Sequence, residues 1–396
     1  MTIRVGIINV TGFAGMEAAR LLWNHPEAEL IAATGRSLAG RQLGEVFPHL
    51  AAYGDFPITS DLDPADIDVT LSALPTTESA GPCAKLLRAG LRVIDIAADF
   101  RIHDAAGFKL AYKVDHPAPH LLPKAVYGLS EIHKEAIQKT SLVANPGCYP
   151  TSALLPSLPF VRAGVVELGG IFVDSKSGVS GAGRKLEDGL LFAEIASNAR
   201  AYKVADHRHT PEIEQELAQA AGTAVKISFI PHLIPTVRGI LTSVLMRLRA
   251  PLDGAAAQAI LEDAYADAPF VRVLPEGATP RARCVKIRWK DKPITHLTQG
   301  IFRSYMYPLY NPAGVSLTTE YPVDHPHHNS IVVSADVFFI KLPPLVPKMS
   351  PLTEEATYNL YVNNVFQGRA PGRIWVADTE SEEISETQLR VTQSIE

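Results

Sequence analysis

The first 96 residues alternate short apolar runs with segments of helical spacing. The apolar runs predict buried strands at 3–10, 29–34, 68–75 and 91–96. Helical spacing falls between them, at 16–23 and 78–89. Because parallel strands need a crossover helix, this alternation predicts an α/β fold with a Rossmann-like, doubly wound parallel sheet. Ligands of such sheets bind beyond the carboxyl ends of the strands.

A glycine-bearing turn, Thr11-Gly12-Phe13-Ala14-Gly15, joins the first strand to the first helix. Strand, glycine turn and helix together form a dinucleotide site in which the helix N-terminus meets the pyrophosphate. Asn9 stands where a Gly-x-x-Gly-x-x-Gly pattern would begin. The alternative is a turn that merely packs a helix on a sheet, and the turn by itself leaves both readings open.

The second strand ends in Thr34-Gly35-Arg36-Ser37. An Asp or Glu at this place binds a free ribose 2′-hydroxyl, whereas Arg36 and Ser37 suit a 2′-phosphate. The pair therefore predicts NADP, with an ordinary exposed arginine at a strand end as the alternative. Leu74 and Pro75 end the third strand at the same edge of the sheet, and 99–101 follow the fourth.

Cys148 follows a Pro-Gly turn, and the helix-competent run 151–155 follows Cys148. A short strand at 142–144 delivers the cysteine to the ligand-binding edge of the sheet. At a helix N-terminus, unpaired N–H groups and the helix dipole favour a thiolate and can hold an oxyanion. Cys148 is therefore predicted to be a nucleophile for an acyl group, and the alternative is a small buried hydrophobe.

The chain changes character after Cys148. Strands are predicted at 170–176, 225–231 and 239–249, and helices at 212–221 and 250–268. A loop at 177–185 is rich enough in glycine for its backbone to approach a ligand closely. His207 and His209 flank Arg208 just before a helix that Thr210 caps, a pattern that favours function over packing. Arg238, at a later bend, either binds an anion or braces the bend.

Bulk properties exclude several classes of protein. A chain of 396 residues predicts two domains, and a net charge of −5 is against nucleic acid or a membrane surface as the main partner. The first residues form a strand rather than a signal peptide, and no apolar run reaches the ~18–20 residues of a membrane span. Cys83, Cys148 and Cys284 are far apart, which suits a reducing cytoplasm.

Residues 324–328, Asp-His-Pro-His-His, invite a metal reading. Their spacing fits no standard site, and Pro326 breaks any helix. An exposed loop is therefore predicted instead, and no metal site is expected in this chain.

The chain resembles the N-acetyl-gamma-glutamyl-phosphate reductases of the semialdehyde dehydrogenase superfamily. The stretches that carry the resemblance follow the family's order over roughly residues 3–275. They are Thr11–Gly15, Thr34–Ser37, Ala98–Arg101, Val126–Glu131, Asn145–Thr151, Ser177–Gly183, His207–Glu212 and Pro231–Gly239.

The resemblance implies an NADP-binding domain over 1–147 and an α+β catalytic domain over 148–351, whose mixed or antiparallel sheet often forms a subunit interface. A homodimer or homotetramer is therefore expected. Cys148 would be the nucleophile, with His209 as the proton carrier and His207 as a substrate contact, or with these two roles exchanged. Arg101, Asn145, Arg208 and Arg238 are assigned to the substrate. The expected cofactor-binding residues are Thr11, Gly12, Phe13, Ala14, Gly15, Arg36, Ser37, Leu74, Pro75, Ser177, Gly178, Gly181, Ala182 and Gly183.

The chain also departs from the family. Asn9 replaces a glycine, and Thr76 stands where a histidine is common. The family's C-terminal helix has an approximate echo at 363–372, after an unusual insertion at about 290–350. The segment 352–396 is expected to pack back on the cofactor domain.

Together, the residues described above and the resemblance to this family predict an NADPH-dependent reductase that converts an acyl phosphate to an aldehyde through a cysteine thioester. N-acetyl-gamma-glutamyl phosphate, an intermediate of arginine biosynthesis, is the first choice of substrate. An aminoadipyl or glutamyl phosphate on a carrier protein is the second, with a basic surface from Lys176, Arg184, Lys185 and Lys203. A non-catalytic NADP-binding relative is the third reading.

Overall fold

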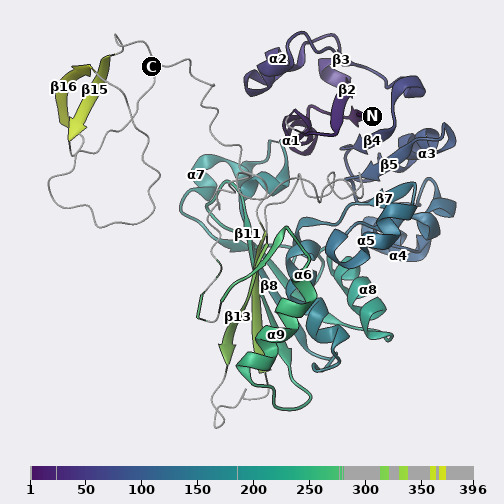
Figure 1. The fold of residues 1–396 in the computed structure, drawn as a ribbon, viewed down its shortest axis with the longest axis vertical. Coiled ribbons are helices and arrows are strands. Elements are labelled where there is room, and N and C mark those ends of the chain that lie inside the picture. The colour runs from purple at the N-terminus through teal and green to yellow at the C-terminus, as the bar shows by residue number, and fades with distance from the viewer. Residues whose placement is uncertain are drawn as a thin grey trace. The chain divides into compact units, whose positions relative to one another are not determined.

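The computed structural model describes residues 2–23, 25–184, 186–275, 277–278 and 280, together with the backbone of four later strands. These strands are β13 (Ala313–Glu320), β14 (Ser330–Val337), β15 (Thr357–Val362) and β16 (Val365–Pro371). The chain divides into two compact units, 1–341 and 342–396 (Figure 1). Each unit is described by itself.

The N-terminal part of the first unit is built on a seven-stranded sheet in the order β3-β2-β1-β4-β5-β7-β6, in which every neighbouring pair is parallel. Its strands are β1 (Ile3–Ile8), β2 (Ala28–Thr34), β3 (Ile58–Thr59), β4 (Val69–Ser72), β5 (Arg92–Asp95), β6 (Val126–Tyr127) and β7 (Leu142–Ala144). The helices are α1 (Phe13–Leu22), α2 (Leu43–Val46), α3 (Ala80–Arg88), α4 (Ala105–Tyr112) and α5 (Ser130–Lys139). The predicted doubly wound parallel sheet is confirmed, and strand order reverses between β1 and β4.

The glycine turn after β1 explains the asparagine that replaces a family glycine. Asn9 has φ of +63°, in the left-handed region that asparagine tolerates better than most residues. Its side-chain amide donates to the carbonyl of Ala73 at 2.8 Å, so the side chain also ties the turn to the end of β4. A Cβ on Gly15 would stand 2.4 Å from the Asn9 carbonyl oxygen. Gly15 is therefore required by close packing of α1 on the turn.

The second sheet is mixed, in the order β12-β13-β14-β11-β8-β10-β9. Its pairs β8–β10 and β12–β13 are parallel, and the others are antiparallel. The further strands are β8 (Ile171–Ser177), β9 (Arg200–Ala201), β10 (Ile227–Leu233), β11 (Ile240–Arg247) and β12 (Val271–Val273). The helices are α6 (Cys148–Arg162), α7 (Phe192–Ile195), α8 (Thr210–Ala221) and α9 (Gly254–Tyr265). The predicted second α+β domain with a mixed sheet is confirmed.

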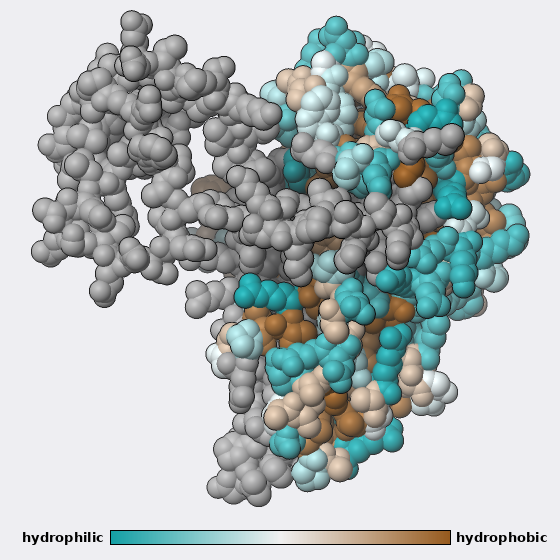
Figure 2. All heavy atoms as spheres, viewed as in Figure 1, coloured by the Kyte–Doolittle hydropathy of each residue, from teal (hydrophilic) through white to brown (hydrophobic). Residues whose placement is uncertain are grey.

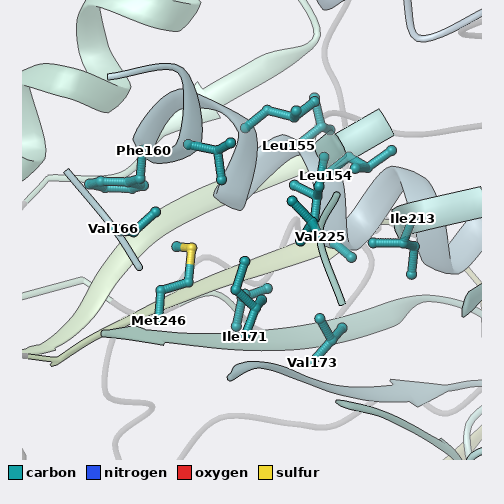
Figure 3. Packing of buried hydrophobic residues seen from close by; sticks show 14 of the residues in the cluster. Leu154, Leu155, Phe160, Val166, Ile171, Val173, Ile213, Val225 and Met246 are labelled. Carbon is teal, nitrogen blue, oxygen red and sulfur yellow. The ribbon is translucent and has the colours of Figure 1, made fainter. Parts of the chain in front are cut away.

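The core of the second domain lies between α6 and one face of this sheet (Figure 3). Residues alternate along β8, so that Ile171 and Val173 are buried while Phe172 and Asp174 on the other face are partly exposed. Leu154 and Phe160 of α6 are fully buried against the same cluster. This packing fixes the axis of α6, and with it the position of Cys148 at the N-terminal end of the helix.

Two strands, β13 and β14, lie in the segment 290–350, which was predicted to be an unusual insertion. β14 pairs with β11, and β13 pairs with both β14 and β12, so both are members of the second sheet. The other residues of 290–350, which include the histidines at 325, 327 and 328, lie outside the described residues.

The second unit contains an antiparallel hairpin of β15 and β16. β16 is a strand at the place where the echo at 363–372 suggested the family's C-terminal helix. The packing of 352–396 on the cofactor domain stays a prediction, because the two units are described separately.

Among the described residues, none of the helices combines the length and the apolar character that crossing a bilayer requires. Figure 2 shows hydrophilic and hydrophobic residues interspersed over the described surface, with brown patches in the lower half of the view.

The contact between Gly15 and Asn9 makes a testable prediction. Gly15→Ala is expected to lower the free energy of unfolding by about 1–3 kcal/mol, because its methyl group meets backbone atoms that cannot rotate away. Gly81→Ala is the matched control, since a Cβ there meets nothing within 4 Å and alanine favours the helix by up to about 1 kcal/mol. Urea unfolding of both variants measures the difference. Equal stability of the two would contradict the packing described here.

Candidate active site

Cys148 is the first residue of α6, and the turn 145–147 connects it to β7. Cys148 is partly exposed as a residue, and its sulfur receives a hydrogen bond from the backbone N–H of Tyr149. Within the described part of the chain, no side chain caps the N-terminus of α6. The predicted placement of the cysteine at a helix start, beyond a strand of the parallel sheet, is thus found in the structure.

The turn before Cys148 is held on both sides by a buried ion pair. Arg101 donates from Nε to the carbonyl of Asn145 at 2.7 Å. Glu212, from the first turn of α8, accepts the backbone N–H of Gly147 at 2.7 Å and the hydroxyl of Tyr127 at 2.8 Å. The guanidinium of Arg101 and the carboxylate of Glu212 lie 3.5 Å apart. The pair joins the first sheet to α8 and fixes the backbone that carries the sulfur.

Gly147 is surrounded by the polar groups of this site. A Cβ on Gly147 would stand 2.8 Å from Nε2 of His209, 2.9 Å from Nη1 of Arg101 and 3.0 Å from Oε2 of Glu212. A larger residue therefore has no room here. The same distances place the His209 imidazole beside the residue that precedes Cys148.

Burial raises the pKa of the Cys148 thiol, and the nearby carboxylate of Glu212 adds to the rise. Arg101, the N–H of Tyr149 and Arg208 oppose it. The helix start was expected to favour the thiolate. The direction found is the reverse, because burial outweighs the helix N–H group and the cations.

Both predicted histidines are buried and uncharged near neutral pH. Burial lowers the pKa of His207 to about 4, helped by Arg208 and Lys203. Burial also lowers the pKa of His209 well below its usual range, with His207 and Arg101 adding to the effect. Nδ1 of His207 accepts the backbone N–H of His209 at 3.1 Å, which leaves the proton of neutral His207 on Nε2.

Aromatic rings exclude water from His207. Tyr149, Tyr202 and Phe229 approach the imidazole edge-on, with ring centroids 5.3–5.6 Å away. The His209 ring lies 4.7 Å from that of His207. The two tyrosines are hydrogen-bonded to each other through their hydroxyls at 3.1 Å. The packing of these aromatic rings explains the desolvation that lowers the pKa values of both histidines.

The three arginines predicted to bind substrate separate into three environments. Arg208 is exposed, and its charge lowers the pKa values of Cys148, His207 and His209. Arg101 is 7% exposed and directs its nitrogens to Asn145, Glu212 and the carbonyl of Ile96. It therefore positions the cysteine turn.

Arg238 acts on a different part of the molecule. Burial raises the pKa of Glu17, on α1, and lowers that of His49, in the 3₁₀ turn Pro48–Tyr53; the charge of Arg238 opposes the first shift and adds to the second. It thus faces the first domain at α1. Among the three arginines, exposure and proximity to the sulfur favour Arg208 for a substrate anion.

Asn145 keeps an unused polar atom in the site. Its side chain is buried, Nδ2 donates to the carbonyl of Pro146, and Oδ1 has no hydrogen-bond partner among the described residues. Nδ1 of His209 is likewise buried without a partner there. Buried polar atoms in this state are places where a substrate can bond.

The edge of the first sheet fits a dinucleotide. Gly12 is the N-cap of α1 with no side-chain cap, so the first turn of the helix presents backbone N–H groups beyond the strand-order reversal. Leu74 is buried and Pro75 exposed just after β4. Arg36 and Ser37 are exposed in a 3₁₀ turn after β2, and Arg36 pairs with Glu78 at 2.6 Å.

The glycine-rich loop of the second domain reaches this edge. Ser177 ends β8, and the 3₁₀ turn Val179–Ala182 follows Gly178. Arg184 donates from Nη1 to the carbonyl of Thr11 at 2.8 Å. Arg184 of this loop therefore contacts the glycine turn, and cofactor binding by Gly181, Ala182 and Gly183 stays a prediction.

Sequence reasoning missed the residues that position others. Glu212 was assigned only to a helix start, Arg184 was assigned only to a basic surface for a carrier protein, and no role was given to Tyr149 or Tyr202. Asp99 also escaped notice, although its carboxylate accepts the backbone N–H groups of Thr77, Ser79 and Ala80. The one available signal was a glutamate three residues after His209, where it also suits a helix N-terminus.

Comparisons with known proteins agree with this geometry. A family model described as "Semialdehyde dehydrogenase, NAD binding domain" matches residues 4–140, and one described as "Semialdehyde dehydrogenase, dimerisation domain" matches residues 148–290. The N-acetyl-gamma-glutamyl-phosphate reductase of Thiobacillus denitrificans is 46% identical over 300 residues, which are 75% of this chain and 87% of the relative. The N-acetyl-gamma-glutamyl-phosphate reductase of Pelotomaculum thermopropionicum is 44% identical over 289 residues, which are 72% of this chain and 83% of the relative.

Solved structures show the same fold. Aspartate semialdehyde dehydrogenase II from Vibrio cholerae has a TM-score of 0.57 and 17% identity, covering 85% of this chain and 93% of its own. Aspartate semialdehyde dehydrogenase with NADP from Candida albicans has a TM-score of 0.54 and 15% identity, covering 86% and 93%.

The environment of Cys148 makes a prediction about pH. Alkylation by iodoacetamide, followed by mass spectrometry of the Cys148 peptide, is expected to show a midpoint above the ordinary thiol pKa of about 8.5. Arg208→Gln is expected to move the midpoint higher, because a cation that favours the thiolate is removed. Arg200→Gln, on β9, is the control and leaves it unchanged. A midpoint below the ordinary value would contradict the account.

The ion pair makes a prediction about stability. Glu212→Ala is expected to lower the free energy of unfolding by about 3–5 kcal/mol, because Arg101 stays buried without its carboxylate. Glu262→Ala, on the exposed face of α9, changes it by less than about 0.5 kcal/mol. Urea unfolding measures both. A loss of unfolding free energy for Glu212→Ala as small as that of the control would show that the ion pair of Arg101 and Glu212 does not hold the turn.

Proposed function

The chain belongs to the N-acetyl-gamma-glutamyl-phosphate reductases, oxidoreductases of the semialdehyde dehydrogenase family, and from that premise we propose that it reduces N-acetyl-gamma-glutamyl phosphate with NADPH. The product is N-acetylglutamate semialdehyde and inorganic phosphate, in a step of arginine biosynthesis. One observation carries the proposal: Cys148 begins α6 while Nε2 of His209 lies against the adjoining Gly147.

The resting pair is a thiol and a neutral imidazole. In the proposal, His209 takes the proton of Cys148 as the sulfur attacks the acyl carbon of the substrate. The backbone N–H groups at the start of α6 stabilise the negative charge that develops on the carbonyl oxygen. The carbon–oxygen bond to phosphate breaks, the leaving oxygen takes a proton from water, phosphate leaves, and an acyl thioester remains on Cys148.

The dinucleotide, when bound, supplies the hydride that reduces the thioester carbon. The imidazolium of His209 returns its proton to the alkoxide that this reduction forms on the Cys148 adduct. The carbon–sulfur bond of the thiohemiacetal then breaks, the hydroxyl proton passes to the sulfur, and the aldehyde leaves. His207, whose Nε2 carries the proton in the neutral tautomer, donates a hydrogen bond to the substrate.

Arg208 is proposed to bind the phosphate of the substrate, because it is an exposed cation close to the sulfur. The buried Oδ1 of Asn145 is proposed to accept a hydrogen bond from the substrate. NADP rather than NAD is proposed as the cofactor. Arg36 and Ser37 support this choice, since a guanidinium and a hydroxyl beyond β2 suit a 2′-phosphate.

The carrier-protein substrate has less support. It needs a basic surface near Cys148, yet Lys176 bonds to Asp174 and Arg184 lies at the glycine turn, so that Lys203 is the exposed candidate left among the described residues. Lys185 lies outside the described residues. The free N-acetylated substrate is therefore preferred.

A homo-oligomer is proposed through the sheet face opposite α6. Phe172, Leu241 and Leu245 are partly exposed there, on β8 and β11. The match of 148–290 to a domain described as a dimerisation domain supports this surface. A dimer or a tetramer is expected.

Replacement of the sulfur tests the proposal. Cys148→Ser is expected to lower kcat at least about 10³-fold, because a serine hydroxyl is a far weaker nucleophile without a strong base beside it. Affinity for NADPH, measured by fluorescence titration, stays within about twofold, since Cys148 is not part of the glycine turn. Cys83→Ser, a buried thiol of α3, is the control and keeps its activity. A near-normal rate for Cys148→Ser would rule out the nucleophile.

A further inference from the structure

The second domain contacts the glycine turn through Arg184, and the loop before Arg184 is paired with the bend at 236–239. Backbone N–H groups of Gly178, Val179 and Ser180 donate to carbonyls of the bend at 236–239, at 2.9–3.0 Å. A Cβ on Gly178 would stand 2.7 Å from the backbone nitrogen of Arg238, so glycine is needed for this pairing. The loop before Arg184 is thereby anchored to a strand-connecting bend of its own domain.

Arg184 extends from this anchored loop onto the first domain. Its guanidinium donates to the carbonyl of Thr11, inside the glycine turn. The same guanidinium lies 6.0 Å from the ring centre of Phe13 and 5.6 Å from that of Phe47. Two rings and one carbonyl thus hold an exposed arginine beside the N-terminus of α1.

We propose that Arg184 binds the pyrophosphate of the bound dinucleotide, so that the second domain completes a site begun by the glycine turn. This inference rests on the proposed function, because it assumes that the turn holds a nicotinamide dinucleotide. The planar guanidinium carries five N–H donors in a geometry that suits phosphate oxygens. Only one of these donors is needed for Thr11, and the first-turn N–H groups of α1 supply the opposite side of the same phosphates.

Arg184 and Arg36 then serve different parts of one ligand. Arg36 stands beyond β2 and pairs with Glu78, in the place expected for the 2′-phosphate. Arg184 bonds to the turn itself, in the place expected for the pyrophosphate. The two arginines are therefore expected to respond to different chemical groups, which a set of nucleotides can separate.

Calorimetric titration of the full-length protein tests this assignment without any turnover. The probes are NADP⁺, NAD⁺ and adenosine 2′-monophosphate, which has the 2′-phosphate but neither phosphate of the pyrophosphate. Arg184→Ala is expected to weaken NADP⁺ and NAD⁺ by a similar factor, roughly 10- to 100-fold, the range of a charge-assisted hydrogen bond. Its affinity for adenosine 2′-monophosphate is expected to change by less than about threefold.

Three further variants complete the experiment. Arg184→Lys is expected to lose less affinity than Arg184→Ala, because it keeps the charge without the planar donors. Arg36→Ala is expected to weaken NADP⁺ and adenosine 2′-monophosphate while sparing NAD⁺. Arg200→Ala is the matched control, since Arg200 also donates to a backbone carbonyl, that of Gly189, but within its own domain. It is expected to bind all three probes as the wild type does.

Each outcome decides the question. Unchanged dinucleotide affinities in Arg184→Ala would overturn the inference, and Arg184 would then make only a structural contact between the two domains. A loss confined to ligands with a 2′-phosphate would also overturn it. Failure of the wild type to bind any of the probes would instead defeat the proposed function.

Discussion

The carboxylate of Glu212 is the group on which the geometry of the site depends. It has no solvent exposure, and it joins three parts of the chain: the turn after β7 through Gly147, Tyr127 of β6, and Arg101 after β5. A buried carboxylate is tolerated because each of its oxygens has a partner. The pair that it forms with Arg101 therefore sets where α6 begins, and so where the sulfur of Cys148 lies.

Burial has a second consequence at this centre. It raises the pKa of Cys148 and lowers those of His207 and His209, so the resting site carries a thiol and two neutral imidazoles. A proton must then move from sulfur to imidazole before or during attack, which gives a nearby neutral histidine a task as a base. The charge of Arg208 favours the thiolate form of Cys148 and so lowers the free energy of ionising the thiol, while the arginine side chain itself is exposed.

The sequence predicted those features that local chemistry determines. Apolar runs identified five of the seven strands of the first sheet but not the two-residue strands β3 and β6, and the turn before Cys148 identified the helix start. The strand predicted for 68–75 ends at Ser72, because Ala73–Pro75 leave the ladder for the ligand edge. Asn9 was taken as a departure from the family, yet its backbone has the left-handed conformation that a glycine would supply.

Features that depend on distant partners were not predictable in this way. Glu212 has an ordinary reason to begin a helix, and only the fold shows that it meets Gly147, 65 residues earlier. Arg238 lies close enough to Glu17 for its charge to oppose the rise that burial causes in the pKa of that carboxyl, and no local pattern placed it near α1; its substrate role stays a prediction. In the second sheet, β14 pairs with β11 and β13 pairs with β14, and no local sequence pattern predicted these two strands.

The central claim is that the Cys148 sulfur becomes acylated beside His209. It is tested most directly by mixing the enzyme with the acyl phosphate in the absence of NADPH and measuring the mass of the Cys148 peptide. The account predicts an acyl adduct on Cys148 that hydroxylamine removes and that added NADPH discharges as aldehyde. Release of phosphate or aldehyde in normal turnover with no adduct on Cys148, or with the adduct on another residue, would contradict it.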